Sequence, residues 1–257
     1  MIAFLRKIRQ SLVSTGKIRS YILYAAGEII LVVIGILIAL QINNWNEEYK
    51  DRQQEGSYYY KFLEDVNQDQ LLLEKLVAEN SQRIKYSNQL LQLLQHEHPE
   101  RKKVIFLLRE AISKIRFRFR PSVSAFDDLK SSGKLAIIKD LSFKKQLLNY
   151  YAEMEGYGEI LDLVADASLS LYFSPTKDFI EMGFQDIYYV RSELDSTLVN
   201  INKLKSPNYP TPAIRKQLMS EAMFHLTNNA RKKELYNTML QEIQNIKTIL
   251  TSKSKLQ

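Results

Sequence analysis

Three arginines alternate with phenylalanines in the run RFRFRP, residues 116–121. In an extended chain alternate side chains point to the same side, so Arg116, Arg118 and Arg120 would form one cationic row. Such a row of guanidinium groups suits the binding of phosphate, carboxylate or an anionic glycan. The alternative is the basic end of a helix, where the same charges complement the helix dipole.

A second candidate is Glu28, the one ionisable residue in a long apolar segment, residues 22–42. Acids within a bilayer are costly and often functional, so Glu28 could pair with a partner helix or carry a proton. Because it lies only about two helical turns inside the segment, a position near the lipid headgroups is the alternative.

The remaining polar patterns do not predict catalysis. His96 and His98 form a His-x-His pair, but the chain has only three histidines and no cysteine, so a polar turn is favoured over a metal site. The acids Asp162 and Asp166 are typical of a solvated helix face, and His225 of a structural histidine. Phosphate loops, nucleophile elbows and HExxH pairs are missing from the sequence. We therefore predict no catalytic residues, no metal site and no cofactor.

The segment 22–42 is long enough to cross a bilayer. At ~1.5 Å per residue its helix would span about 30 Å, the thickness of the hydrocarbon core. Tyr24 near one end and Trp45 beyond the other suit the aromatic belts at membrane surfaces. The sequence LQINNWNEE after Ala39 lacks the small residues of a signal-peptide cleavage site, which favours an uncleaved signal-anchor.

Positive charge is concentrated before this segment. Residues 1–24 contain five basic residues and no acid, and so supply most of the net charge of +7. This pattern predicts a cytoplasmic tail (1–21), a transmembrane helix (22–42) in the inner membrane and a periplasmic domain (43–257). It also argues against nucleic-acid binding, which would place the charge on the folded part. The first thirteen residues predict an amphipathic helix on the membrane surface, with an unstructured tail as the alternative.

The scarcity of glycine (8) and proline (6) predicts few, long elements and an all-α protein. We expect one N-terminal transmembrane helix followed by a helical-bundle soluble domain with a long juxtamembrane helix. Between Leu63 and Leu94, mainly apolar residues recur at spacings of three and four, so this helix should continue to about Gln95. The same seam suits a coiled-coil stalk or a helix of an intramolecular bundle.

Turn and cap residues then divide the rest of the chain. Ser124 and Asp127 resemble a capping box, and Asp140 or Ser142 should cap the next helix. Further helices are expected at 100–119, 125–132, 141–155, 160–173 and 212–251.

Glycines and asparagines mark the expected interruptions. Gly133 suits a left-handed helix end. Gly156 and Gly158 predict a turn between two helices, and Asn228-Asn229 suggests a break in the last one.

Two stretches, GEIILVVIGILIALQINNWNEE (27–48) and FRPSVSAFDDLKSSGKLAIIKD (119–140), followed by LLNYY, resemble a family of uncharacterised single-pass membrane proteins of the Bacteroidota. The resemblance implies a bacterial envelope protein with one membrane anchor. The family is a domain of unknown function, so the resemblance carries over no catalytic or binding residues.

Taken together, these features favour a non-enzymatic, membrane-anchored helical module, sensor-like or accessory, that binds a protein partner or ligand in the cell envelope. The expected partners are the lipid bilayer and a protein or a second copy of the chain, with no nucleic acid. One alternative is an envelope scaffold that contacts cell wall or anionic glycan through Arg116, Arg118 and Arg120. Another is a hydrolase of cell-wall or lipid substrates with an unrecognised carboxylate site.

Overall fold

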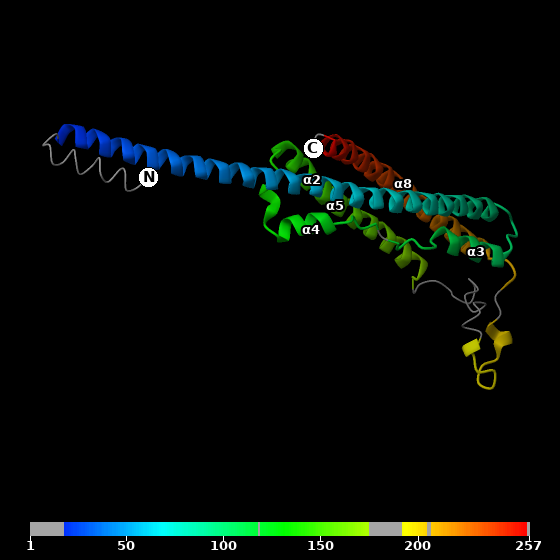
Figure 1. Cartoon of the computed structure of the whole chain (residues 1–257). Helices are drawn as coiled ribbons and strands as arrows, with labels where there is room; N and C mark the ends of the chain where they lie inside the picture. The colour runs from blue at the N-terminus through cyan, green and yellow to red at the C-terminus, as the bar shows by residue number, and fades with distance from the viewer. Residues whose placement is uncertain (1–17, 118, 175–191, 205–206, 256–257) are drawn as a thin grey trace. The chain divides into compact units, whose positions relative to one another are not determined.

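Long helices dominate the computed structural model, which describes residues 18–117, 119–174, 192–204 and 207–255 (Figure 1). The described residues form α2 (Ile18–Leu94), α3 (Arg101–Ala111), α4 (Ser124–Ser131), α5 (Leu141–Tyr172) and α8 (Pro212–Ser254), with short 3-10 helices η1 (Lys134–Ala136) and η3 (Ile201–Leu204). They contain no strand, so the all-α prediction is confirmed. The amphipathic helix predicted for the first thirteen residues lies outside the described residues.

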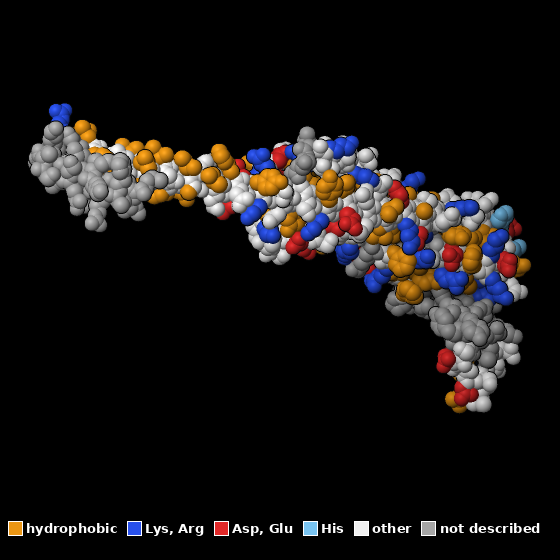
Figure 2. Space-filling model, viewed as in Figure 1, with side chains coloured by type: hydrophobic (Ala, Val, Ile, Leu, Met, Phe, Trp, Pro, Cys, Tyr) orange, Lys and Arg blue, Asp and Glu red, His pale blue; other side chains and the backbone are white. Residues whose placement is uncertain are grey.

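Helix α2 is continuous over 77 residues, as the unbroken apolar and heptad patterns predict. Contacts divide the chain into two units, Met1–Ser57 and Tyr58–Gln257. In the first unit the large apolar side chains between positions 29 and 42 are all exposed, Leu31 by 73% and Leu40 by 54% (Figure 2). Exposure of this kind suits lipid as the surrounding solvent. The described residues thus contain one helix that is long and apolar enough to cross a membrane.

The second unit is built around three long helices, the later part of α2 together with α5 and α8. Tyr59 of α2 packs edge-on against Phe143 near the start of α5, with ring centroids 5.2 Å apart. The Tyr60 hydroxyl donates to the Ser254 carbonyl at the end of α8, at 3.2 Å. Helix α5 therefore runs in the same direction as α2, and α8 runs back alongside them.

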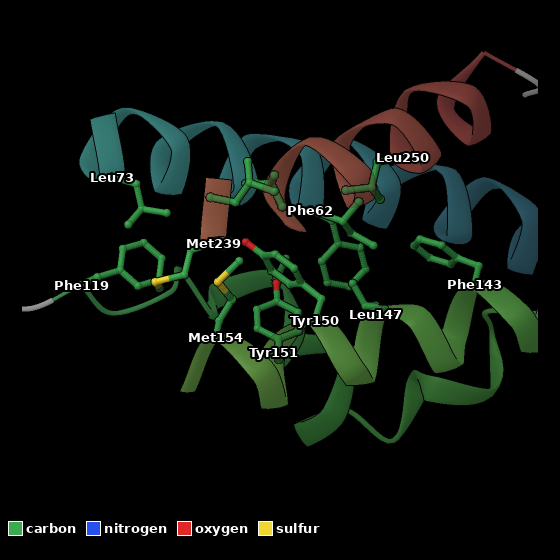
Figure 3. Close-up of a cluster of buried hydrophobic side chains, with 14 of the residues drawn as sticks. Phe62, Leu73, Phe119, Phe143, Leu147, Tyr150, Tyr151, Met154, Met239 and Leu250 are labelled. Atoms are coloured by element: carbon green, nitrogen blue, oxygen red, sulfur yellow. The ribbon is translucent and has the colours of Figure 1, made fainter. Parts of the chain in front are cut away.

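Two apolar clusters form the core of this bundle. The larger joins α2, α4, α5 and α8, and Figure 3 shows it between the three long helices; its fully buried members include Phe62, Leu73, Phe143, Met154, Met239 and Leu250. The smaller lies where α3 packs on α8 and the ends of α2 and α5. Burial of this apolar surface, rather than the helical propensity of each segment alone, stabilises the bundle.

The seam predicted along α2 is right at every second position. Val66, Leu73, Asn80 and Leu94 are buried as predicted, together with Ser87. The alternate positions 63, 70, 77, 84 and 91 are only half-buried, and their predecessors in the chain, Phe62, Asp69, Leu76, Arg83 and Leu90, take the core positions. At these positions the buried stripe of α2 therefore lies one residue before the predicted stripe. In this arrangement α2 packs against two helices of its own chain, which suits a bundle better than a two-stranded coiled coil.

The helix predicted for 100–119 is too long, because α3 ends at Ala111. Lys114 then adopts a left-handed conformation (φ 55°) that stops helical continuation. Ile115 and Phe119 beyond it remain buried, so the chain still packs on the bundle after leaving the helix. Carbonyl groups freed at this helix end accept hydrogen bonds from other helices, as described below.

The interruptions predicted at Gly156 and Gly158 and at Asn228-Asn229 are also wrong. Helix α5 is continuous through Gly156 and Gly158. A Cβ at Gly158 would lie 3.2 Å from Arg120 Nη1, so this glycine admits a close neighbour rather than a turn. Helix α8 is continuous through Asn228 and Asn229, whose side chains bond to other elements.

Two helix starts and one turn are as predicted. Asp140 caps α5 by accepting hydrogen bonds from the Ser142 and Phe143 amides at 2.9 and 3.0 Å. Thr211 caps α8, whose first residue is Pro212. Gly133 is left-handed, with φ 69°.

Candidate functional site

The interior of the bundle contains ionisable side chains where apolar ones would be expected. Asp65, Asp69 and Arg83 on α2 and Lys232 on α8 are each at most 5% exposed. A buried charge is costly unless polar groups surround it, so the partners of these residues define what the site does. Most of those partners belong to the α3–α4 connection, residues 112–123, which we call the strap, or lie directly beside it.

Two aspartates, the acid pair, hold the end of the strap and the start of α4. Asp69 accepts from the Ser122 amide at 2.8 Å and from the Tyr150 hydroxyl at 3.1 Å. Asp65 accepts from the Ser124 hydroxyl at 2.9 Å and the Ala125 amide at 3.0 Å. The cap of α4 is therefore a carboxylate from another helix, which corrects the predicted capping box of Ser124 and Asp127.

Burial shifts the protonation of this region toward neutral forms. It raises the pKa of Asp69, an effect that the bonds from Ser122 and Tyr150 oppose and the nearby Asp65 charge reinforces. Burial also raises the pKa of Tyr150 and Tyr151 far above their ordinary value, and the two aspartates add to that shift. Both tyrosines are thus hydrogen-bond donors or apolar surfaces at neutral pH, and neither is a base.

Two cations, the cation pair, hold the beginning of the strap. Arg83 donates to the Ser113 carbonyl at 3.2 Å, and Lys232 donates to the Ile115 carbonyl at 2.8 Å. Asn229 donates to the Ala111 carbonyl at 2.9 Å, and its own side-chain oxygen accepts from Arg83 at 3.2 Å. These donors satisfy carbonyls at and just after the end of α3, where the helix dipole is negative.

Burial of the cation pair costs free energy, because both side chains lose hydration. Burial lowers the pKa of Lys232 from 10.5 to about 8, and the neighbouring Arg83 charge acts in the same direction. Asp162 and Asp166 of α5 oppose the shift. Burial likewise lowers the pKa of Arg83. The main-chain carbonyls of the strap therefore replace part of the hydration that both cations lose.

The predicted arginine row lies in the strap and is used internally. Arg116 donates to Asp166 through Nε at 3.1 Å and Nη2 at 2.6 Å, and Arg120 donates to Asp162 at 3.0 Å. The two acids expected to form a solvated face are thus the partners of two of the arginines. All four side chains remain partly exposed. Arg118 lies outside the described residues.

The other singled-out residues are scattered. Glu28 is an exposed residue of the apolar part of α2. His96 lies in the turn after α2, where its carbonyl accepts from Arg215 at 2.6 Å, and the ring of His98 packs beside Tyr209. His225 is fully buried and bonds Glu221 one turn earlier, at 3.4 Å. Among the described residues, no three His, Cys, Asp or Glu side chains are grouped to hold a metal ion.

A surface groove lies between α2 and α3. Gln89, Gln92, Leu93 and His96 line it from the α2 side, and Lys103, Phe106 and Leu107 from α3. Its volume is about 420 Å³, within the range of ordinary ligand sites. Its polar lining residues are the two glutamines, His96 and Lys103. Its apolar lining residues are Phe106 and two leucines that are at least half-buried, which we call the leucine floor. A hollow of this size on the described surface could receive a side chain or a short peptide segment.

Neither the strap contacts nor the groove could be found from motifs. Asp65, Asp69, Arg83 and Lys232 are ordinary polar residues of amphipathic helices in the sequence. One signal existed, because Asn80 falls on the predicted apolar seam and its amide reaches the Asn229 carbonyl at 2.8 Å. A polar residue on a buried stripe indicates a buried partner, but the sequence does not say which.

The fold and the site together define a helical bundle with a strap fastened by buried polar side chains, preceded by a candidate membrane helix. A family of unknown function (DUF6090) matches residues 28–166, more than half of the chain, and the protein belongs to this family. The match includes Glu28, the strap and α4, and it ends within α5. Comparisons with curated proteins and with solved structures found no match.

Proposed function

We propose that this protein is a membrane-anchored, non-enzymatic helical module that binds a polypeptide partner in the cell envelope. The observation that carries the proposal is how the buried ionisable groups are used. Asp65, Asp69, Arg83 and Lys232 bond to main-chain or hydroxyl groups of their own fold, so they serve architecture rather than a reacting substrate. A rigid bundle of this kind is a suitable platform for presenting a binding surface.

The proposal also includes a location. The five basic residues before the apolar segment favour a cytoplasmic N-terminus, and hence an inner-membrane anchor and a periplasmic bundle. The family resemblance noted in the sequence supports an origin in the Bacteroidota. A partner would act as the relay across the membrane or as the complex that this chain supports.

Site-specific photocrosslinking of the full chain in intact membranes tests the proposal. Exposed glutamines lie on three helices of the bundle, Gln68 and Gln92 on α2, Gln146 on α5 and Gln244 on α8. Each would be replaced singly by the photoreactive residue benzoylphenylalanine. A specific adduct with one polypeptide, at some positions and absent at others, is the expected result. Monomer alone at all four positions would contradict the proposal.

A further inference from the structure

The groove between α2 and α3 has the geometry of a polypeptide-binding site. Gln89, Gln92 and Leu93 lie on one face of α2 at spacings of three and four residues, and His96 follows in the turn after the helix. Opposite them, Phe106 of α3 is 45% exposed and is held by an edge-on contact with Tyr86, with ring centroids 6.2 Å apart. An exposed aromatic ring fixed in this way is typical of an anchor point in an interface.

The charge around the groove is biased toward cations. Lys103 lines it and none of the lining residues is acidic. Arg109 lies over the Phe106 ring at 6.0 Å from its centroid, and Arg215 donates to the His96 carbonyl at the other end. The first turn of α3 contains no acid, and the residue before it, Glu100, makes no capping hydrogen bond with its side chain.

Acids occur near the groove but outside its lining. Glu97 and Glu100 belong to the turn between the two helices, and Glu110 lies beside Arg109 with an Nε–Oε1 distance of 3.7 Å. The lining that a bound segment would touch thus offers amide groups, an aromatic ring and the positive charge of Lys103.

We infer that this groove binds an acidic, amphipathic segment of the partner polypeptide, an inference that rests on the proposed function. A carboxylate of the segment would lie at Lys103, and a large apolar side chain would contact Phe106 and the leucine floor. The amides of Gln89 and Gln92 can both donate and accept, so they match the peptide groups or polar side chains of such a segment. Charge sets the register and orientation, and the apolar contact supplies most of the affinity.

Crosslinking from Gln92, combined with charge reversal, tests the inference in the full chain. The adduct formed at Gln92 should map to a partner peptide rich in Asp and Glu. Lys103→Glu should lower the yield of that adduct about tenfold, since it removes an attraction and introduces a repulsion. The matched control is Lys233→Glu, an exposed lysine of α8, which should leave the yield unchanged. Unchanged thermal melting of both variants would show that the bundle remains folded.

Failure of the inference can be told apart from failure of the proposed function. A partner adduct at Gln68, Gln146 or Gln244 but none at Gln92 would overturn the groove while the binding function stands. So would an adduct at Gln92 that maps to a basic or neutral peptide, to lipid or glycan, or that is insensitive to Lys103→Glu. Adducts with a second copy of the chain would support the inference only if they map to an acidic segment. Absence of adducts at every position would overturn both.

Discussion

Lys232 should make the stability of the bundle rise with pH in the mildly alkaline range. The folded protein lowers the pKa of this amine from 10.5 to about 8. Between these two values the unfolded chain holds a proton that the folded chain has lost. Because stability rises with pH wherever the unfolded state binds more protons, the free energy of unfolding should increase from pH 8 toward 10.5.

The size of the effect follows from the shift. At ~1.4 kcal/mol per pKa unit the whole shift corresponds to about 3 kcal/mol, of which about 2 kcal/mol develops between pH 7.5 and 9.5. For a unit of this size that is roughly 4–8 °C in melting temperature. Above pH 10 the raised pKa values of Tyr150 and Tyr151 act in the opposite direction, so measurements belong below that pH.

The assay compares the full-length protein in detergent micelles with Lys232→Met, using urea unfolding followed by circular dichroism at several pH values. The variant should lack the rise between pH 7.5 and 9.5. Losing the bond to the Ile115 carbonyl would lower its stability by about 1–3 kcal/mol, but by the same amount at each pH. Lys233→Met removes an exposed amine one residue away and should keep the wild-type slope. Equal slopes in wild type and Lys232→Met would refute the reasoning.

Three further changes test other parts of the structure. Asp69→Asn should remove a component of stability that is present at low pH and lost as the pH rises above 3.8, because the folded protein raises the pKa of Asp69. Thermal melts should therefore show the variant gaining stability relative to wild type as the pH rises from 4 to 7, and a constant difference would contradict the raised pKa. Gly156→Ala should stabilise α5 by about 1 kcal/mol, because the added Cβ would meet open space. Gly158→Ala should stabilise α5 less, because Arg120 must move to admit the Cβ. Equal gains of the two variants in urea unfolding would contradict the close contact at Gly158. Single cysteines replacing Ser11 and Ser252 should react differently with a maleimide that cannot cross the inner membrane. Labelling only at position 252 is expected for a periplasmic bundle. Labelling only at position 11 would show the opposite orientation.

Much of the helical architecture follows from local sequence. The apolar segment 22–42 needs no tertiary contact to be recognised, because its composition alone sets its preference for lipid. The caps at Asp140 and Thr211 and the left-handed Gly133 are likewise local, since each depends on hydrogen bonds or sterics within a few residues. The long α2 is predicted by a spacing that persists over many turns.

Where a helix is interrupted, however, depends on what lies beside it. Gly158 predicted a turn, yet α5 continues through it, and the missing side chain leaves room for Arg120 of the strap. Asn229 predicted a break, yet its side chain bonds the end of α3 and leaves α8 intact. The same residue types that end a helix in isolation are used inside a bundle to admit or bond a neighbour.

The sequence by itself determined that residues 22–42 are a candidate membrane helix and that the described part of the chain is all-α, because apolar length and helical periodicity are properties of contiguous residues. Only the tertiary structure decided that Asp65 caps α4 and that Lys232 donates a hydrogen bond to a main-chain carbonyl of the strap. These contacts join residues about 60 and 117 positions apart. A buried charge is tolerated only where distant groups replace its lost hydration, and no local pattern records where those groups will be.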